Sequence, residues 1–136
     1  MLALCPKPAR FKMANECILV VEKDVLIRLE ISNHLREAGF VVVEAASADD
    51  AWAFMTAEGV VDLVFTEIAT PGVLDGLALA QLASARFMAL PLLLTGEATR
   101  PPPPGPWTFI AKPYAPRRVK TVIVEALGLN KKRDEP

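Results

Sequence analysis

The sequence predicts a single α/β domain with a doubly wound, five-stranded parallel sheet. Short, uninterrupted runs of β-branched and other apolar residues are typical of strands buried on both faces. Segments with apolar residues at helical spacing follow most of these runs, so strands and helices alternate. Such alternation implies a parallel sheet with helices on both faces. The chain has 136 residues, and domains usually run to about 100–150 residues, so one domain is expected.

The first half of the chain contains two strand and helix units. Residues 18–21 (Ile-Leu-Val-Val) form the first predicted strand. A helix is predicted over 25–38, where apolar residues recur at helical spacing and Gly39 marks a stop. Residues 40–43 repeat the strand pattern, and the second helix runs from the N-cap residue Ser47 to near residue 59.

The second half contains three strands and two helices. The third strand, 60–67, is an apolar run that ends in an acidic residue, and a helix rich in Ala and Leu follows over 75–87. The fourth strand is predicted at 90–95 and the fifth at 109–111. The last helix, 116–127, begins with proline and carries a regular apolar stripe.

The connection between the fourth and fifth strands breaks the alternation. Five of the residues between 96 and 108 are proline, namely Pro101, Pro102, Pro103, Pro104 and Pro106. Each proline inside a helix costs about 3 kcal/mol, so a regular helix is excluded there. We therefore expect an extended, Pro-rich loop in place of the fourth helix.

Composition limits the possible partners and locations. The chain carries 15 Lys plus Arg against 16 Asp plus Glu, a formal net charge of −1, which gives no global basic field for nucleic acid or a membrane surface. The apolar residues, 52% of the chain, form runs far shorter than the roughly 18 residues of a membrane-spanning helix. We predict a cytoplasmic protein without nucleic-acid or membrane partners.

The sequence predicts a domain at 16–129 with a short tail at each end. Residues 1–15 lack the order of a signal peptide and are predicted to be a loose tail, with either Met1 or Met13 as the true start. Residues 130–136 are a charged tail. With no output domain after residue 130, the chain is expected to act as a stand-alone module.

Chemically distinctive residues follow four of the predicted strands. Because the carboxyl ends of parallel strands meet at one edge of the sheet, where ligands of such folds bind, these residues form a candidate site. Carboxylates that accept a phosphoryl group or hold Mg²⁺, with a hydroxyl and an ammonium for its oxygens, suit phosphoryl chemistry. The set is Glu22, Lys23, Asp24, Glu67, Thr95 and Lys112. Taken alone, Asp24 is equally well explained as a helix N-cap.

Several motifs give the chain a resemblance to the receiver domain of two-component response regulators, over about residues 16–128. They are Ile18-Leu-Val-Val-Glu-Lys-Asp24, Asp62-Leu-Val-Phe-Thr-Glu-Ile-Ala-Thr-Pro-Gly72, Asp75-Gly76, Leu93-Leu-Thr-Gly96 and Ala111-Lys-Pro-Tyr114. The resemblance implies a flavodoxin-like, CheY-like fold with strand order 2-1-3-4-5. It also implies a family activity, the transfer of a phosphoryl group from a histidine kinase to an aspartate, with Mg²⁺.

The resemblance also assigns roles to individual residues. It places Glu67 at the phosphoacceptor position, Glu22 at the first position of the acidic pair after the first strand, and Lys23 at the second, which binds the metal in the family. It further matches Thr95 to the switch hydroxyl, Phe109 to the switch aromatic and Lys112 to the phosphate-binding lysine. Two of these positions, Glu67 and Lys23, depart from the family pattern.

The two departures predict different losses. A glutamate carries its carboxylate roughly 1 Å further out, and a misplacement of that size can cost about a hundredfold in rate. Lys23 replaces an anionic ligand with a cation, and two unit charges 4 Å apart cost about 4 kcal/mol at an effective dielectric of 20. We therefore expect no metal and no cofactor at this site.

Three readings of the altered pocket follow. In one, Lys23 pairs with Glu67, and Glu67 reaches toward Thr95 or Lys112 and imitates the phosphorylated state. In another, Lys23 extends into solvent and the pocket has lost its chemistry while the binding surface persists. In the third, the chain still accepts a phosphoryl group with Mg²⁺ and a kinase donor.

The leading functional prediction is a non-catalytic pseudo-receiver that works by binding another protein. Its expected partners are a histidine kinase, a phosphotransferase or another regulator, and the Pro-rich loop with Phe109 and Tyr114 is the expected surface. The missing helix belongs to the usual dimerisation face of the family, so the oligomeric state stays open. A flavodoxin-like ligand binder is disfavoured, because no Gly-rich phosphate loop follows the first strand.

Overall fold

The computed structural model of the chain describes residues 15–57 and 59–129. The predicted tails at 1–15 and 130–136 lie outside these residues, apart from Asn15. Five parallel strands form one sheet in the order β2-β1-β3-β4-β5, as the sequence predicts. The strands are β1 (Cys17–Val21), β2 (Val41–Ala45), β3 (Leu63–Glu67), β4 (Leu92–Glu97) and β5 (Thr108–Lys112).

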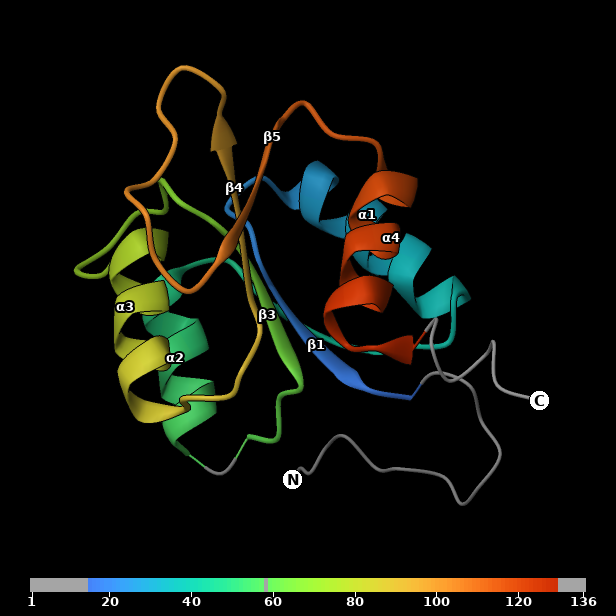
Figure 1. Cartoon of the computed structure of the whole chain (residues 1–136), viewed down its shortest axis with the longest axis horizontal. Helices are drawn as coiled ribbons and strands as arrows, with labels where there is room; N and C mark the ends of the chain where they lie inside the picture. The colour runs from blue at the N-terminus through green and yellow to red at the C-terminus, as the bar shows by residue number, and fades with distance from the viewer. Residues whose placement is uncertain (1–14, 58, 130–136) are drawn as a thin grey trace.

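Helices cover both faces of the sheet (Figure 1). Helices α1 (Val25–Glu37) and α4 (Pro116–Ala126) lie on one face and contact each other. Helices α2 (Ala48–Thr56) and α3 (Gly76–Arg86) lie together on the other face. The sheet thus has one layer of helices on each face, which is the α/β architecture that the sequence predicts.

Strand β1 divides its side chains between two hydrophobic clusters. Ile18 and Val20 belong to the cluster under α1 and α4, whereas Leu19 and Val21 belong to the cluster under α2 and α3. Side chains alternate between the faces of a strand, so a central strand with helices on both sides must be apolar throughout. This is why the run at 18–21 has no polar interruption.

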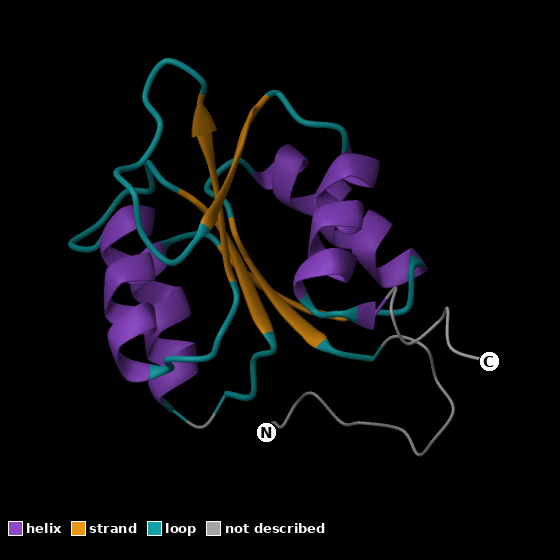
Figure 2. Cartoon of the chain, in the orientation of Figure 1, coloured by secondary structure: helices purple, strands orange, loops and turns teal. Residues whose placement is uncertain are grey.

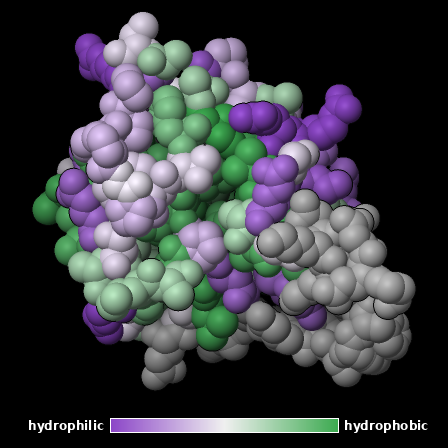
Figure 3. All heavy atoms as spheres, in the orientation of Figure 1, coloured by the Kyte–Doolittle hydropathy of each residue, from purple (hydrophilic) through white to green (hydrophobic). Residues whose placement is uncertain are grey.

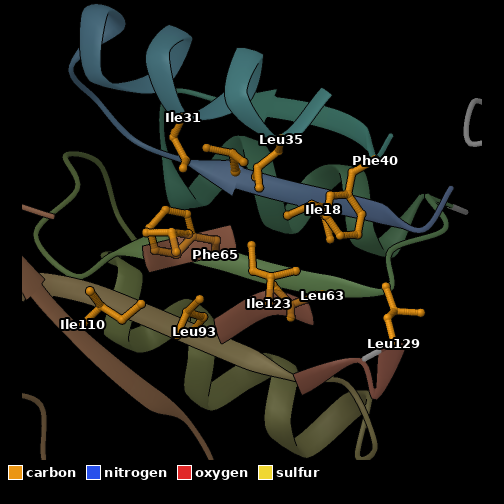
Figure 4. Packing of buried hydrophobic residues seen from close by; sticks show 12 residues of the cluster. Ile18, Ile31, Leu35, Phe40, Leu63, Phe65, Leu93, Ile110, Ile123 and Leu129 are labelled. Carbon is orange, nitrogen blue, oxygen red and sulfur yellow. The ribbon is translucent and has the colours of Figure 1, made fainter. Parts of the chain in front are cut away.

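Figure 4 shows the cluster beneath α1 and α4. Ile31 and Leu35 of α1 and Ile123 of α4 are fully buried against Phe65 and Leu63 of β3. Burying one such side chain contributes roughly 1.5–3 kcal/mol relative to exposure. The helical spacing of these residues in the sequence therefore corresponds to the faces that the helices bury.

No helix connects β4 to β5 in this fully described part of the chain (Figure 2). Residues 98–107, hereafter the Pro-rich loop, make the crossing instead. Trp107 at its end and Phe109 in β5 pack against the cluster under α2 and α3. The aromatic side chains thus cover part of the sheet face that would otherwise lack a helix.

Some predicted boundaries are shifted, and each shift has a local cause. Strand β4 starts at Leu92 rather than at residue 90, because Pro91 has no N–H and takes part in pairing only through its carbonyl, which accepts from Val64 N at 3.1 Å. Strand β2 covers 41–45 rather than 40–43, and the buried Phe40 packs into the core just before it. Strand β3 starts at Leu63, since Val60 is exposed.

Among the described residues, no helix has both the length and the apolar character needed to cross a membrane.

Candidate functional site

The residues predicted to form a site meet at the edge where the parallel strands end. Glu22 directly follows β1, Glu67 is the last residue of β3, and Lys112 is the last residue of β5. In the register of the sheet, Glu67 lies beside Thr95 of β4. Their convergence follows from parallel pairing, because strand ends of the same polarity share one edge.

Glu67 lies at the centre of this edge and is 6% exposed. A single oxygen, Oε2, accepts hydrogen bonds from Lys23 Nζ at 2.7 Å and from Lys112 Nζ at 2.8 Å. The other oxygen, Oε1, accepts a long bond from the backbone N–H of Lys23 at 3.4 Å. The carboxylate is therefore held from two sides by ammonium groups.

Lys23 bridges two strands' ends. Besides Glu67, its Nζ donates to the backbone carbonyl of Ala69 at 2.9 Å, and its side chain is 48% exposed. The alternative in which Lys23 extends freely into solvent is thus not the conformation present. The contact with Ala69 involves a backbone carbonyl, which no residue type in the sequence could have indicated.

Glu22 completes a group of four charges. Lys112 Nζ forms an ion pair with Glu22 Oε1 at 2.9 Å, and Glu22 Oε2 accepts a hydrogen bond from Asp24 N at 3.0 Å. Hereafter the charge quartet denotes Glu22, Glu67, Lys23 and Lys112. Two buried carboxylates facing two ammonium groups have a formal sum of zero.

The surroundings shift the pKa of each buried member of the quartet. Burial raises the pKa of Glu22, and the nearby Glu67 adds to the rise. Burial alone would also raise the pKa of Glu67, but the hydrogen bonds from Lys112 and Lys23 outweigh it and lower that pKa. The pKa of Lys112 is raised, because its contacts with Glu67 and Glu22 outweigh the effect of burial.

Asp24 has a structural position. Its Oδ1 accepts from Leu26 N at 2.9 Å and from Ile27 N at 3.1 Å, which makes it the N-cap of α1. An N-cap side chain pairs otherwise unsatisfied N–H groups of the first turn and is typically worth about 1 kcal/mol. Of the two readings of Asp24, the structure has the helix cap.

The two residues matched to the family switch behave differently. Thr95 is 1% exposed, and within the described residues its hydroxyl makes no hydrogen bond, so Glu67 reaches Lys112 but does not engage Thr95. Phe109 is half-buried and packs on the side of α2 and α3. Tyr114 packs instead on the other cluster, with its ring edge-on to Phe65 at 5.5 Å between centroids.

A pocket of about 410 Å³ opens above Glu67. Lys23 and Lys112 line it together with Arg100 of the Pro-rich loop. Arg100 is not among the site residues predicted from the sequence, although a lone basic residue between β4 and the prolines was a signal that could have placed it there.

A second missed residue is Asp49, near the start of α2. Its two carboxylate oxygens accept from Val73 N at 2.9 Å and from Leu74 N at 3.1 Å, in the loop between β3 and α3. From the sequence alone, Asp49 is only an acid in the first turn of the helix that begins after Ser47. A link between segments so far apart in the sequence leaves no local pattern.

The geometry does not suit Mg²⁺, the ion that the family resemblance implies. Mg²⁺ prefers oxygen ligands in octahedral geometry, usually carboxylates and waters. Here Lys23 brings an ammonium group to the carboxylate of Glu67, and no cluster of three or more His, Cys, Asp or Glu in the described residues is arranged to hold a metal ion. The arrangement can hold an anion between two lysines, and Glu67 fills that position.

Comparison with known proteins identifies the family. The family model described as the response regulator receiver domain matches residues 18–124. This chain belongs to the response regulator receiver family. A receiver domain is a signalling module, and the predicted family, the CheY-like fold and the link to two-component signalling are thus confirmed.

Individual relatives agree with this assignment. The chain is 34% identical over 112 residues to the C4-dicarboxylate transport transcriptional regulatory protein DctD of Rhizobium meliloti (strain 1021), covering 78% of this chain and 24% of that protein. It therefore spans about a quarter of that relative's length. The receiver domain of NtrX from Brucella abortus has a TM-score of 0.71 at 30% identity, covering 82% of this chain and 98% of that one.

A third match concerns the fold alone. A response regulator from Chloroflexus aurantiacus has a TM-score of 0.74 at 21% identity and covers 84% of this receiver and 98% of its own chain. The receiver assignment applies to nearly all the described residues of the chain. The match does not assign roles to Glu67 and Lys23.

Proposed function

We propose that this receiver is a phosphorylation-independent module of two-component signalling that acts in the cytoplasm by binding another protein. The observation that carries the proposal is the pair of lysine contacts to Glu67 Oε2, at 2.7 Å from Lys23 and 2.8 Å from Lys112. The position where a receiver would accept a phosphoryl group is filled by a carboxylate that is already paired.

The proposal includes the loss of the metal requirement. Lys23 supplies one positive charge beside Glu67, and a divalent cation brought to the same place would be repelled by it. Without that ion, an incoming phosphoryl group lacks the metal that the family mechanism requires, and the two ammonium groups at the site are already paired with Glu67. We therefore propose that the module uses neither Mg²⁺ nor another cofactor.

The contacts favour a structural part for Glu67 over a merely decayed pocket. Its carboxylate joins the end of β3 to Lys23 after β1 and to Lys112 at the end of β5. It thereby holds together strand ends that a phosphoryl group and a metal ion would otherwise join. The proposal therefore predicts that the ends of β1, β3 and β5 keep the same arrangement whether or not a kinase is active.

The proposed partners are those of the family: a histidine kinase, a phosphotransferase or another regulator. The proposed surface lies around the edge strand β5, with Phe109 and the Pro-rich loop on the side of α2 and α3 and Tyr114 on the side of α1 and α4. Burial raises the pKa of Tyr114, with smaller contributions from the charges of Glu22 and Glu30. Tyr114 is therefore a neutral, largely apolar part of this surface at physiological pH.

The experiment is incubation of the purified chain with a small phosphodonor and Mg²⁺, followed by intact mass measurement. We expect no acid-labile increase of one phosphoryl group. A stoichiometric adduct would establish the alternative, a phosphorylation-competent receiver, and overturn the proposal. To test the part of Glu67, binding of the cognate kinase or regulator is compared between wild type and Glu67→Ala; unchanged binding would show that Glu67 holds no signalling state.

A further inference from the structure

The Pro-rich loop contains a short segment whose backbone shape is dictated by its sequence. Residues 100–104 read Arg-Pro-Pro-Pro-Pro. Proline fixes its own φ near −65°, and a residue that precedes proline is driven to extended conformations. Residues 101–103 are in neither helix nor strand. Polyproline II is the conformation that satisfies both restrictions along such a run.

The exposure of this segment agrees with that shape. A polyproline II helix has three residues per turn, so residues three apart lie on the same edge. Pro102 is half-buried, whereas Arg100, Pro101, Pro103 and Pro104 are exposed. One edge therefore faces the protein, and two edges face solvent, one with Arg100 and Pro103 and the other with Pro101 and Pro104.

Trp107 fastens the segment to the domain. Its Nε1 donates to the carbonyl of Pro103 at 3.0 Å, and its indole packs against the cluster under α2 and α3. The ring also lies over Gly105, where a Cβ atom would run into it. The prolines are thus held in one orientation, so binding a partner would cost the segment little further conformational entropy.

Figure 3 shows the setting of this segment on the surface. Pale spheres of the Pro-rich loop stand at the left of the viewed face, beside a strip of hydrophobic residues. Arg100 is open to solvent: its side chain is 86% exposed, and its ion pair with Glu97 is 4.0 Å long. A charge that is so weakly engaged is available to a partner.

We propose that residues 100–104 are a docking ligand for a partner protein with an aromatic-lined groove and a carboxylate at one end. Proline-rich segments bind such grooves by inserting adjacent edges between aromatic side chains. Here Pro101 and Pro104 form one inserted edge and Pro103 part of the other. Arg100 pairs with the carboxylate and fixes the direction of the segment. The proposal does not involve Glu67, so its test is independent of whether the chain is phosphorylated.

The test is a nuclear magnetic resonance titration of the full-length, ¹⁵N-labelled chain with isolated SH3, WW and EVH1 domains as probes of polyproline recognition. We expect at least one domain to give saturable shifts at Gly105 and at the Trp107 indole N–H, with a dissociation constant of about 1 mM or tighter. The double variant Pro101→Ala/Pro104→Ala should weaken that binding by about tenfold or more.

Matched variants separate the edges of the segment. Pro102→Ala changes the edge that faces the protein and should alter the affinity by less than about threefold. Arg100→Ala should weaken binding and reduce its dependence on salt concentration. Sedimentation of the unlabelled chain tests whether the segment binds a second copy of this chain instead of a different protein.

Three outcomes would overturn the proposal. One is that no probe domain binds at millimolar concentration. Another is that Pro102→Ala weakens binding as much as the double variant. The third is self-association of the wild type that is lost in Pro101→Ala/Pro104→Ala, since the loop would then serve contact between copies. Phosphodonor treatment of the same samples reports on the proposed function, whatever the titration shows.

Discussion

Lys23, in the loop after β1, places its Nζ atom 2.7 Å from Oε2 of Glu67, which ends β3 44 residues later. The two positions that, by the resemblance, depart from the receiver pattern are therefore in direct contact. The positive charge of Lys23 neutralises the carboxylate of Glu67, and the extra methylene of glutamate relative to aspartate extends that carboxylate toward the lysine. This contact is what the proposed function expects if the two positions changed together and not as two separate losses.

The joint change can be reversed in a double variant. Lys23→Asp/Glu67→Asp removes the ammonium and shortens the acid, so we expect Mg²⁺-dependent phosphorylation by a small phosphodonor, seen as an added phosphoryl mass. Glu67→Asp alone keeps Lys23 at the site and should stay unmodified, because the cation still opposes the metal. Equal labelling of the single variant and the double variant would show that Lys23 is not the barrier.

Removing Lys112 should destabilise the domain strongly. Lys112→Met leaves Glu22 and Glu67, both buried, without the cation they share, and breaking a buried pair in this way costs about 3–5 kcal/mol. Urea unfolding at pH 7 measures the loss. Lys23→Met should cost less, since Lys23 is half exposed and leaves Lys112 in place. Arg117→Met, an exposed change on α4, is the control and should stay within about 0.5 kcal/mol of wild type.

The two glutamates should affect acid stability in opposite directions. The pKa of Glu67 is lowered from its ordinary value of 4.5, so its stabilisation is present above pH 4.5 and is lost as the pH falls through the folded value. The pKa of Glu22 is raised from 4.5, so its stabilisation is present below pH 4.5 and is lost as the pH rises through the folded value.

These signs are measurable as differences between variants. Unfolding free energies are followed against pH for wild type, Glu67→Gln and Glu22→Gln. On acidification below pH 4.5, wild type should lose stability relative to Glu67→Gln. On acidification toward pH 4.5, wild type should gain stability relative to Glu22→Gln. Differences of the same sign in both comparisons would contradict the assignment.

Emptying the space between the lysines should create an anion site. In Glu67→Ala, Lys23 and Lys112 lose the carboxylate that they share. Inorganic phosphate should then stabilise the variant more than wild type, by about 1.4 kcal/mol at ten times its dissociation constant. Thermal unfolding with and without phosphate measures this. Glu97→Ala removes an exposed carboxylate from the same pocket and is the control. If phosphate stabilised Glu97→Ala as much as Glu67→Ala, the effect would come from the change in net charge alone.

The sequence predicted the fold because its signals were local. Strand β1 had to be apolar on both faces, and the prolines of the 98–107 loop excluded a helix without reference to any other segment. The convergence of Glu22, Glu67, Thr95 and Lys112 followed from parallel pairing. The roles that the resemblance gives to these residues stay predictions.

What the sequence could not predict depends on contacts between distant segments. The hydrogen bond from Lys23 to the carbonyl of Ala69 uses a backbone group that every residue carries. The position of Arg100 at the pocket depends on the path of the Pro-rich loop. Glu67 was expected to reach toward Thr95 or Lys112; it accepts a hydrogen bond from Lys112, and which of the two it would contact could not be read from the sequence.

The hydrogen bonds that Asp49 accepts have a consequence for local motion. Val73 is 94% exposed, yet its backbone N–H donates to Asp49 at 2.9 Å. An amide that is bonded to a fixed carboxylate exchanges its hydrogen with solvent only when the loop opens. We therefore expect Val73 and Leu74 to exchange slowly for residues at the surface, and faster once Asp49 is replaced by alanine. The loop after Glu67 is, by this reasoning, a stiff part of the domain despite its exposed position.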